Sequence, residues 1–91
     1  MNTVTGIQHA PEGFYADLVK PFAEEMIKQL RANEHKGSFQ QWRPSYTEWR
    51  DEMKRLMVLV ESAVLTDDQE AARRVMADIG NVALAGWHIQ R

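Results

Sequence analysis

The sequence predicts an all-α protein of three helices, which we expect to form a helical bundle completed by association with other copies. Three apolar stripes with helical spacing support this fold class, two of them follow a capping signal, and no segment is a credible strand. A chain of 91 residues fits one domain. At this size folding buries only about two-thirds of the unfolded surface. We therefore expect a marginal monomer and a homodimer or homotetramer.

The first expected helix follows residues 1–13, a polar stretch without sustained period that we interpret as a loose arm. Residues 14–91 then form the domain. The apolar face of this helix is made of Tyr15, Val19, Phe22, Met26 and Leu30. Pro21 lies inside the pattern, so it either starts the main helix at its first turn or kinks a longer one. The helix should end near Asn33, a tolerable C-cap residue.

The connection from Asn33 to Pro44 is polar, but it contains Phe39 and Trp42. An aromatic-bearing connection of this length is more often folded over something than free. Both aromatic residues could stack a nucleobase, although covering the end of the bundle is the use we favour.

The second expected helix begins with a capping box, in which Ser45 is the N-cap and Glu48 reaches back to it. Its apolar stripe is Trp49, Met53, Leu56, Val60 and Ala63. The third helix starts in a similar way, with Asp67 as the expected N-cap. Its expected buried side is Ala71, Ala72, Val75, Ile79, Val82, Ala83 and Gly86. These small residues allow another helix to approach closely.

Composition excludes several classes of function. The formal net charge of −2 argues against a broad basic surface, so we expect no nucleic-acid polymer as partner. The chain has no cysteine, which excludes disulfides and thiolate metal sites. No apolar run approaches the roughly 20 residues of a membrane span, and the N-terminus does not resemble a signal peptide. We expect a cytoplasmic protein without a membrane partner.

Two carboxylates stand beside the apolar stripes of the second and third helices. At about 100° per residue, Asp78 falls within the apolar sector of its helix, and Glu52 lies on the flank of its stripe. A buried charge needs a cation, a hydrogen-bond donor or a metal. If the two helices pack antiparallel, both acids could face one cleft. Because Mg²⁺ is held by few carboxylates, waters and substrate phosphates, a minimal magnesium site is plausible.

Structural interpretations compete with this one. Arg74 lies one turn before Asp78 and could pair with it, and Glu52 could pair with Arg55 on an exposed face. We interpret Glu48 as a cap and leave Asp51 undecided between ligand and helix-start acid. Asn33 and Lys36 offer groups that can contact phosphate, although such loop residues are more often solvated.

Three segments taken in order resemble a known family. They are Leu30-Arg31-Ala32-Asn33-Glu34-His35-Lys36-Gly37, followed by Trp42; Trp49-Arg50-Asp51-Glu52-Met53-Lys54-Arg55-Leu56; and Met76-Ala77-Asp78-Ile79-Gly80-Asn81-Val82-Ala83. This set is similar to the MazG-like all-α nucleoside triphosphate pyrophosphohydrolases, in particular their short phage and mobile-element members. The resemblance covers roughly Phe22 to Ile89.

The resemblance implies two helices that carry Glu-x-x-Glu and Glu-x-x-Asp pairs, which bind magnesium and hold a triphosphate while water attacks. Glu52 matches the first acid of the first pair, and Asp78 matches the last acid of the second. Arg55 and Val75 stand where the family has two further glutamates. By the same resemblance, Lys36 and Asn33 match a loop that meets the nucleotide, and family members are dimers or tetramers.

The leading expectation is a nucleotide pyrophosphohydrolase with an incomplete, degenerate set of metal ligands, which converts a (d)NTP to a (d)NMP and pyrophosphate. Glu52 and Asp78 would be catalytic and hold Mg²⁺ with Asp51. Substrate-binding residues would be Asn33, Lys36, Trp42 and Arg55. The alternative is a catalytically inactive helical oligomer that binds a nucleotide or a protein, with Arg55 contacting phosphate directly. A plain oligomerisation module would explain the stripes but not the loop sequence.

Overall fold

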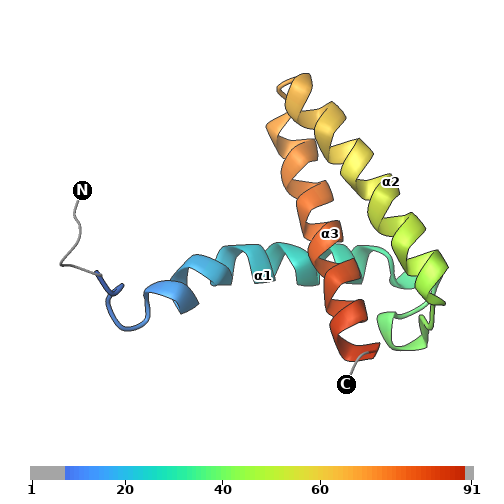
Figure 1. Ribbon diagram of the computed structural model, residues 1–91, viewed down its shortest axis with the longest axis horizontal. Helices are drawn as coiled ribbons and strands as arrows, with labels where there is room; N and C mark the ends of the chain where they lie inside the picture. The colour runs from blue at the N-terminus through green and yellow to red at the C-terminus, as the bar shows by residue number, and fades with distance from the viewer. Residues whose placement is uncertain (1–7, 90–91) are drawn as a thin grey trace.

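The computed structural model describes residues 8–89, which form three α-helices joined by short connections (Figure 1). Helix α1 covers Phe14–Ala32, α2 covers Tyr46–Leu65 and α3 covers Gln69–Ile89. Two 3-10 turns, η1 (Glu34–Lys36) and η2 (Phe39–Gln41), lie between α1 and α2. Because residues 8–89 contain no strand, the predicted all-α class is confirmed. No helix in this range is long and apolar enough to cross a bilayer.

The predicted arm, residues 1–13, lies partly outside the described residues, and residues 8–13 contain no helix. Helix α1 begins after Gly13, whose φ of 86° belongs to the left-handed region that favours glycine. Pro21 lies inside α1, so the longer helix is the observed alternative. The predicted end at Asn33 is confirmed: its backbone N–H lies 3.1 Å from the Gln29 carbonyl oxygen, and its Nδ2 donates to the same oxygen at 2.9 Å.

Helix α2 starts with the predicted capping box. The Glu48 N–H donates to Ser45 Oγ at 3.1 Å, and the Ser45 N–H donates to Glu48 Oε1 at 2.9 Å. The two side chains thereby satisfy backbone groups that the first helical turn leaves without partners. Helices α2 and α3 then run antiparallel as a hairpin (Figure 1).

The expected N-cap of the third helix is wrong by one residue. Asp67 has a φ of 56° and its N–H donates to the Val64 carbonyl, so it belongs to the end of α2. Asp68 is the residue that caps α3, because its Oδ1 accepts the Ala71 N–H at 3.1 Å. A left-handed residue after the helix end is a common way to terminate a helix. Because Asp67 terminates α2 in this way, the N-cap of α3 lies one residue later than the sequence pattern indicated.

The core of the hairpin is small and rich in alanine. Its buried apolar residues are Leu56, Val60, Ala63, Ala72, Ala77, Val82 and Ala85. Trp49 fixes the open end of the hairpin, since its Nε1 donates to the Val82 carbonyl at 2.8 Å. A Cβ at Gly86 would lie 2.8 Å from Trp49 Nε1, so the predicted close approach at a small residue is confirmed. Ala83, expected to be buried, is exposed because it lies about 100° around α3 from Val82.

Helix α1 crosses the hairpin instead of running along it, and its N-terminal half extends beyond the other helices (Figure 1). It contacts α3 where a Cβ at Gly80 would lie 2.9 Å from the Phe22 ring and 3.0 Å from Met26 Sδ. One hydrogen bond ties the two helices, from Asn81 Nδ2 to the Met26 carbonyl at 3.0 Å. Even so, no residue of α1 is buried.

Candidate functional site

A pocket of about 500 Å³ opens where the end of α1, the connection after it and the two hairpin helices meet. It is lined by six of the seven site residues that the sequence predicted: Asn33, Lys36, Trp42, Glu52, Arg55 and Asp78. The seventh, Asp51, is not among the lining residues. Antiparallel packing of α2 and α3 is the reason that Glu52 and Asp78 border one cavity although 26 positions separate them in the chain.

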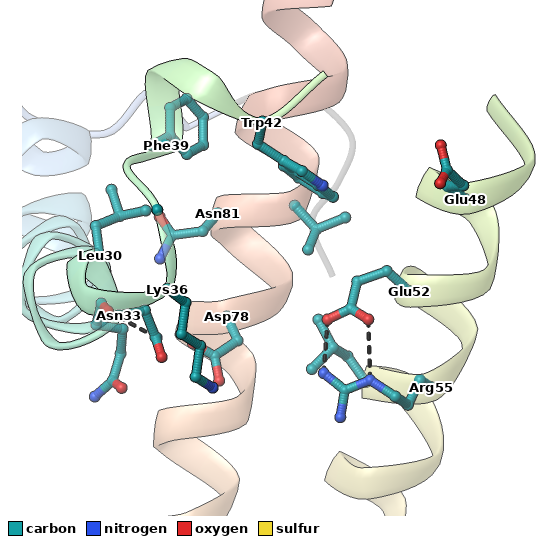
Figure 2. A pocket seen from close by; sticks show the side chains of 14 residues that line it. Leu30, Asn33, Lys36, Phe39, Trp42, Glu48, Glu52, Arg55, Asp78 and Asn81 are labelled. Atoms are coloured by element: carbon teal, nitrogen blue, oxygen red, sulfur yellow. Dashed lines mark hydrogen bonds and ion pairs between the residues drawn. The ribbon is translucent and has the colours of Figure 1, made fainter. Parts of the chain in front are cut away.

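The lining changes character from one end of the pocket to the other (Figure 2). Phe39 and Trp42 lie together in the upper part of the view, whereas Lys36, Asp78, Glu52 and Arg55 gather in the lower part. The aromatic residues come from the connection between α1 and α2, which folds over the cavity. The pocket therefore has an aromatic end and an end with two cations and two acids, and a third acid, Glu48, lines it near the start of α2.

Arg55 and Glu52 form a bidentate ion pair across one turn of α2. Arg55 Nε donates to Glu52 Oε1 at 2.9 Å and Nη2 donates to Oε2 at 2.6 Å (Figure 2). This hydrogen bonding lowers the pKa of Glu52, because both bonds favour the ionised carboxylate. The structure thus contains the ion pair that the structural alternative for Glu52 predicted. Since 58% of the Arg55 side chain is exposed, the guanidinium is accessible to a ligand.

Asp78 faces the same pocket from α3. Within residues 8–89 its carboxylate has no hydrogen bond or ion pair, and Arg74, its expected partner, instead lies 3.6 Å from Glu70. Burial raises the pKa of Asp78, and the attraction of Arg55 and Arg74 opposes that rise. The Arg74 pairing expected in the structural alternative is therefore not formed.

A resident metal site is not evident from these donors. Glu48 binds the backbone of Ser45, Asp51 lies 3.2 Å from Arg50, and Glu52 is held by Arg55. Within residues 8–89 no three histidine or acidic side chains are grouped so that they could hold a metal ion. Only Glu52 and Asp78 remain as potential magnesium ligands, so the set does not fit a metal held by the protein alone. Magnesium is commonly held by one or two carboxylates together with substrate phosphates.

Sequence reasoning did not single out Asn81, which is 8% exposed and lines the pocket. Its Nδ2 is used by Met26, whereas its buried Oδ1 has no hydrogen-bond partner. The available signal was its position one turn after Asp78, beside Val82 on the apolar side of the helix. Leu30, Gln29 and Gly37 complete this part of the lining.

A scan of protein families, a search of characterised proteins and a search of solved structures found no match to this chain. The site must therefore be judged on its own chemistry. A bidentate arginine and a lysine suit phosphate groups, and paired aromatic side chains suit the face of a planar ring.

Proposed function

We propose that this chain is a MazG-like protein that binds a nucleoside phosphate in the pocket, with its phosphates toward Arg55 and Lys36. The observation that carries the proposal is the division of one cavity into a charged end, which holds Arg55 and Lys36 beside two acids, and an aromatic end. Its volume of about 500 Å³ lies within the range of small-molecule sites.

Arg55 is the central residue of the proposed binding mode. A guanidinium presents the same pair of parallel donors to a phosphate as to a carboxylate, so a phosphate can replace Glu52 as its partner. Lys36 adds a second positive charge at the same end of the cavity. This mode requires no resident metal, because Arg55 and Lys36 supply the positive charge.

The binding test is a thermal-shift and calorimetric titration with nucleoside triphosphates, with and without magnesium. We expect a triphosphate to stabilise the protein without magnesium, and Arg55→Ala to weaken binding by about ten-fold or more. Arg50→Ala is the matched control, because Arg50 pairs with Asp51 outside the pocket.

Arg55→Ala also leaves Glu52 without its partner, so a second variant separates the two effects. The double variant Glu52→Gln/Arg55→Ala removes this unpaired negative charge as well as the cation. We expect the double variant to bind as weakly as Arg55→Ala. Recovery of wild-type affinity in the double variant, or no stabilisation by any nucleotide, contradicts the proposed binding mode.

A second candidate function is hydrolysis of a (d)NTP to a (d)NMP and pyrophosphate, which the convergence of Glu52 and Asp78 on the pocket favours. Magnesium would then enter as part of the substrate complex. The assay is pyrophosphate release from a panel of triphosphates with magnesium, and Asp78→Asn should abolish it. No release at high protein concentration would leave only the binding function.

The oligomer forms part of the proposal because one chain leaves much apolar surface uncovered. On one face of α1 the larger apolar side chains are 43–68% exposed, namely Phe14, Tyr15, Leu18, Val19 and Phe22. We propose that a second copy covers this face and completes a helical bundle. A homodimer or homotetramer would then supply the buried area that the alanine-rich core of one chain lacks.

A further inference from the structure

From the side chain of Asn81, and resting on the proposed nucleotide site, we infer that the pocket selects nucleobases that carry an exocyclic amino group. Asn81 is more than nine-tenths buried, lines the pocket and leaves one polar atom, Oδ1, without a partner. A buried acceptor without a donor is unfavourable and therefore rare in folded proteins.

The orientation of the amide is fixed by α1. Nδ2 donates to the Met26 carbonyl at 3.0 Å, so exchanging the two amide atoms would set one oxygen against another. The bond to Met26 explains one half of the side chain as a tie between α1 and α3. It does not explain the other half, because alanine or valine, which fill neighbouring buried positions, would leave no orphan acceptor.

The position of Asn81 relates this acceptor to the base and not to the phosphates. Figure 2 shows Asn81 on the side of the pocket nearer to Phe39 and Leu30, away from the Glu52–Arg55 pair. A nucleotide with its phosphates at Arg55 and Lys36 brings its base to this aromatic end. There, Phe39 and Trp42 can contact the face of the ring.

The missing partner is a donor, which sets the chemistry of the base. The amino group of adenine, cytosine or guanine can give one N–H to Oδ1. Uracil and thymine have no amino group. Their single ring N–H stands between two carbonyl oxygens, so it reaches a recessed acceptor less easily than a terminal amino group does. Because Oδ1 is covered by its neighbours, a side chain beside it must move before the base can reach it.

The test compares ligands that differ only in this donor, bound by the wild-type protein without magnesium. ATP is compared with purine riboside 5′-triphosphate, which lacks the amino group, and CTP with UTP. We expect each amino-bearing nucleotide to bind roughly ten-fold more tightly than its partner. Equal affinities within both pairs would overturn the inference while leaving the nucleotide site intact, whereas no binding of any triphosphate would refute the proposed function itself.

A variant provides an independent readout. Asn81→Leu has a similar volume and removes both amide atoms, so we expect it to lose the discrimination between ATP and purine riboside triphosphate. Inorganic tripolyphosphate, which reaches only Arg55 and Lys36, should bind wild type and variant equally. Discrimination that survives in a folded Asn81→Leu protein contradicts the inference. If this variant does not fold, the comparison of ligands on the wild-type protein decides.

Discussion

The α2–α3 hairpin and α1 are held in very different ways. All eight buried residues of the described chain belong to the hairpin, which also has a hydrogen-bonded cap at the start of each helix. Helix α1 has 19 residues and none is buried. It is tied to α3 by one side-chain hydrogen bond and a close contact at Gly80.

The hairpin and α1 therefore differ in what they need for their stability. The hairpin satisfies its own backbone ends and buries small residues between its helices. Within residues 8–89, α3 covers only part of the apolar face of α1, around Phe22 and Met26. We therefore expect the stability of α1 to depend on another molecule. The pocket lies where the two parts meet, because Leu30 and Asn33 come from the end of α1 and the acids from the hairpin. Assembly and ligand binding are therefore expected to depend on each other.

The largest effect is expected from a substitution on the apolar face of α1 that disrupts self-association. Leu18→Lys places a charge on a 63% exposed leucine of the apolar face, and we expect it to weaken self-association by about ten-fold or more. Light scattering coupled to size-exclusion chromatography measures the change. Glu24→Lys introduces the same side chain on another side of α1 and should have little effect. A wild-type protein that is monomeric at every concentration would refute this expectation.

Alanine substitutions at two glycines of α3 compare its contact with α2, at Gly86, and its contact with α1, at Gly80. Gly86→Ala sets a Cβ 2.8 Å from the Trp49 ring, whose Nε1 is bonded to Val82, so we expect a loss of about 1–3 kcal/mol of unfolding free energy. Gly80→Ala meets the ends of Phe22 and Met26, which can move with α1. We expect a loss below about 1 kcal/mol there, partly offset by helix propensity. Urea denaturation that gives the reverse order would mean that the α1 contact is the more rigid one.

The turn between α2 and α3 can be tested at two neighbouring aspartates. Asp68→Ala removes the side chain that accepts the Ala71 N–H, and should cost about 1 kcal/mol. Asp67→Gly should be neutral or stabilising, since glycine adopts the φ of 56° more easily than aspartate. Thermal unfolding of both variants decides which residue caps α3, and a larger loss for Asp67→Gly would reverse our assignment.

The smallest expected effect concerns the pH dependence of stability. Burial raises the pKa of Asp78, so ionising this carboxyl group in the folded protein lowers the free energy of unfolding. The loss is absent below the ordinary pKa of 3.8 and grows as the pH rises through the raised pKa. Asp78→Asn should thus be more stable than wild type at neutral pH and equal to it in acid. Glu52→Gln should behave oppositely, because the lowered pKa of Glu52 adds stability that is lost as the pH falls below about its ordinary 4.5. Unfolding measured across this range should show differences of opposite sign, and differences that do not change with pH would exclude titration as their cause.

Much of the fold follows from local sequence signals. The 3–4 spacing of apolar residues predicts the helices, and Ser45 with Glu48 predicts the start of α2. The exception is the turn, where Asp67 and Asp68 are equally good caps by composition. Only the left-handed backbone at Asp67 distinguishes them, and that conformation depends on how the two helices meet.

The candidate site was predictable only in part. Glu52 and Asp78 were recognised because acids beside an apolar stripe are unusual. Lys36 and Trp42 were recognised because a cation can contact phosphate and an aromatic side chain can stack on a base. Asn81 was missed, since a single amide in a helix gives no sign of which of its atoms will find a partner. The pairing of Arg74 with Glu70 was overlooked, although Glu70 lies four residues N-terminal to Arg74 and Asp78 four residues C-terminal to it, and the first order is the better one for an ion pair on a helix.

The sequence alone determines three helices, a small alanine-rich interface and the residue types available to a pocket, because periodicity, capping and charge are local properties. The tertiary structure decides which of these residues share a cavity and which atoms remain without partners. Arg55 is bonded to Glu52 within one helix, whereas Asp78 and Asn81 reach the same cavity from α3 with oxygens that have no partner within residues 8–89. These outcomes depend on how the helices pack, since desolvation and hydrogen-bond geometry are set by contacts between segments that are distant in the chain.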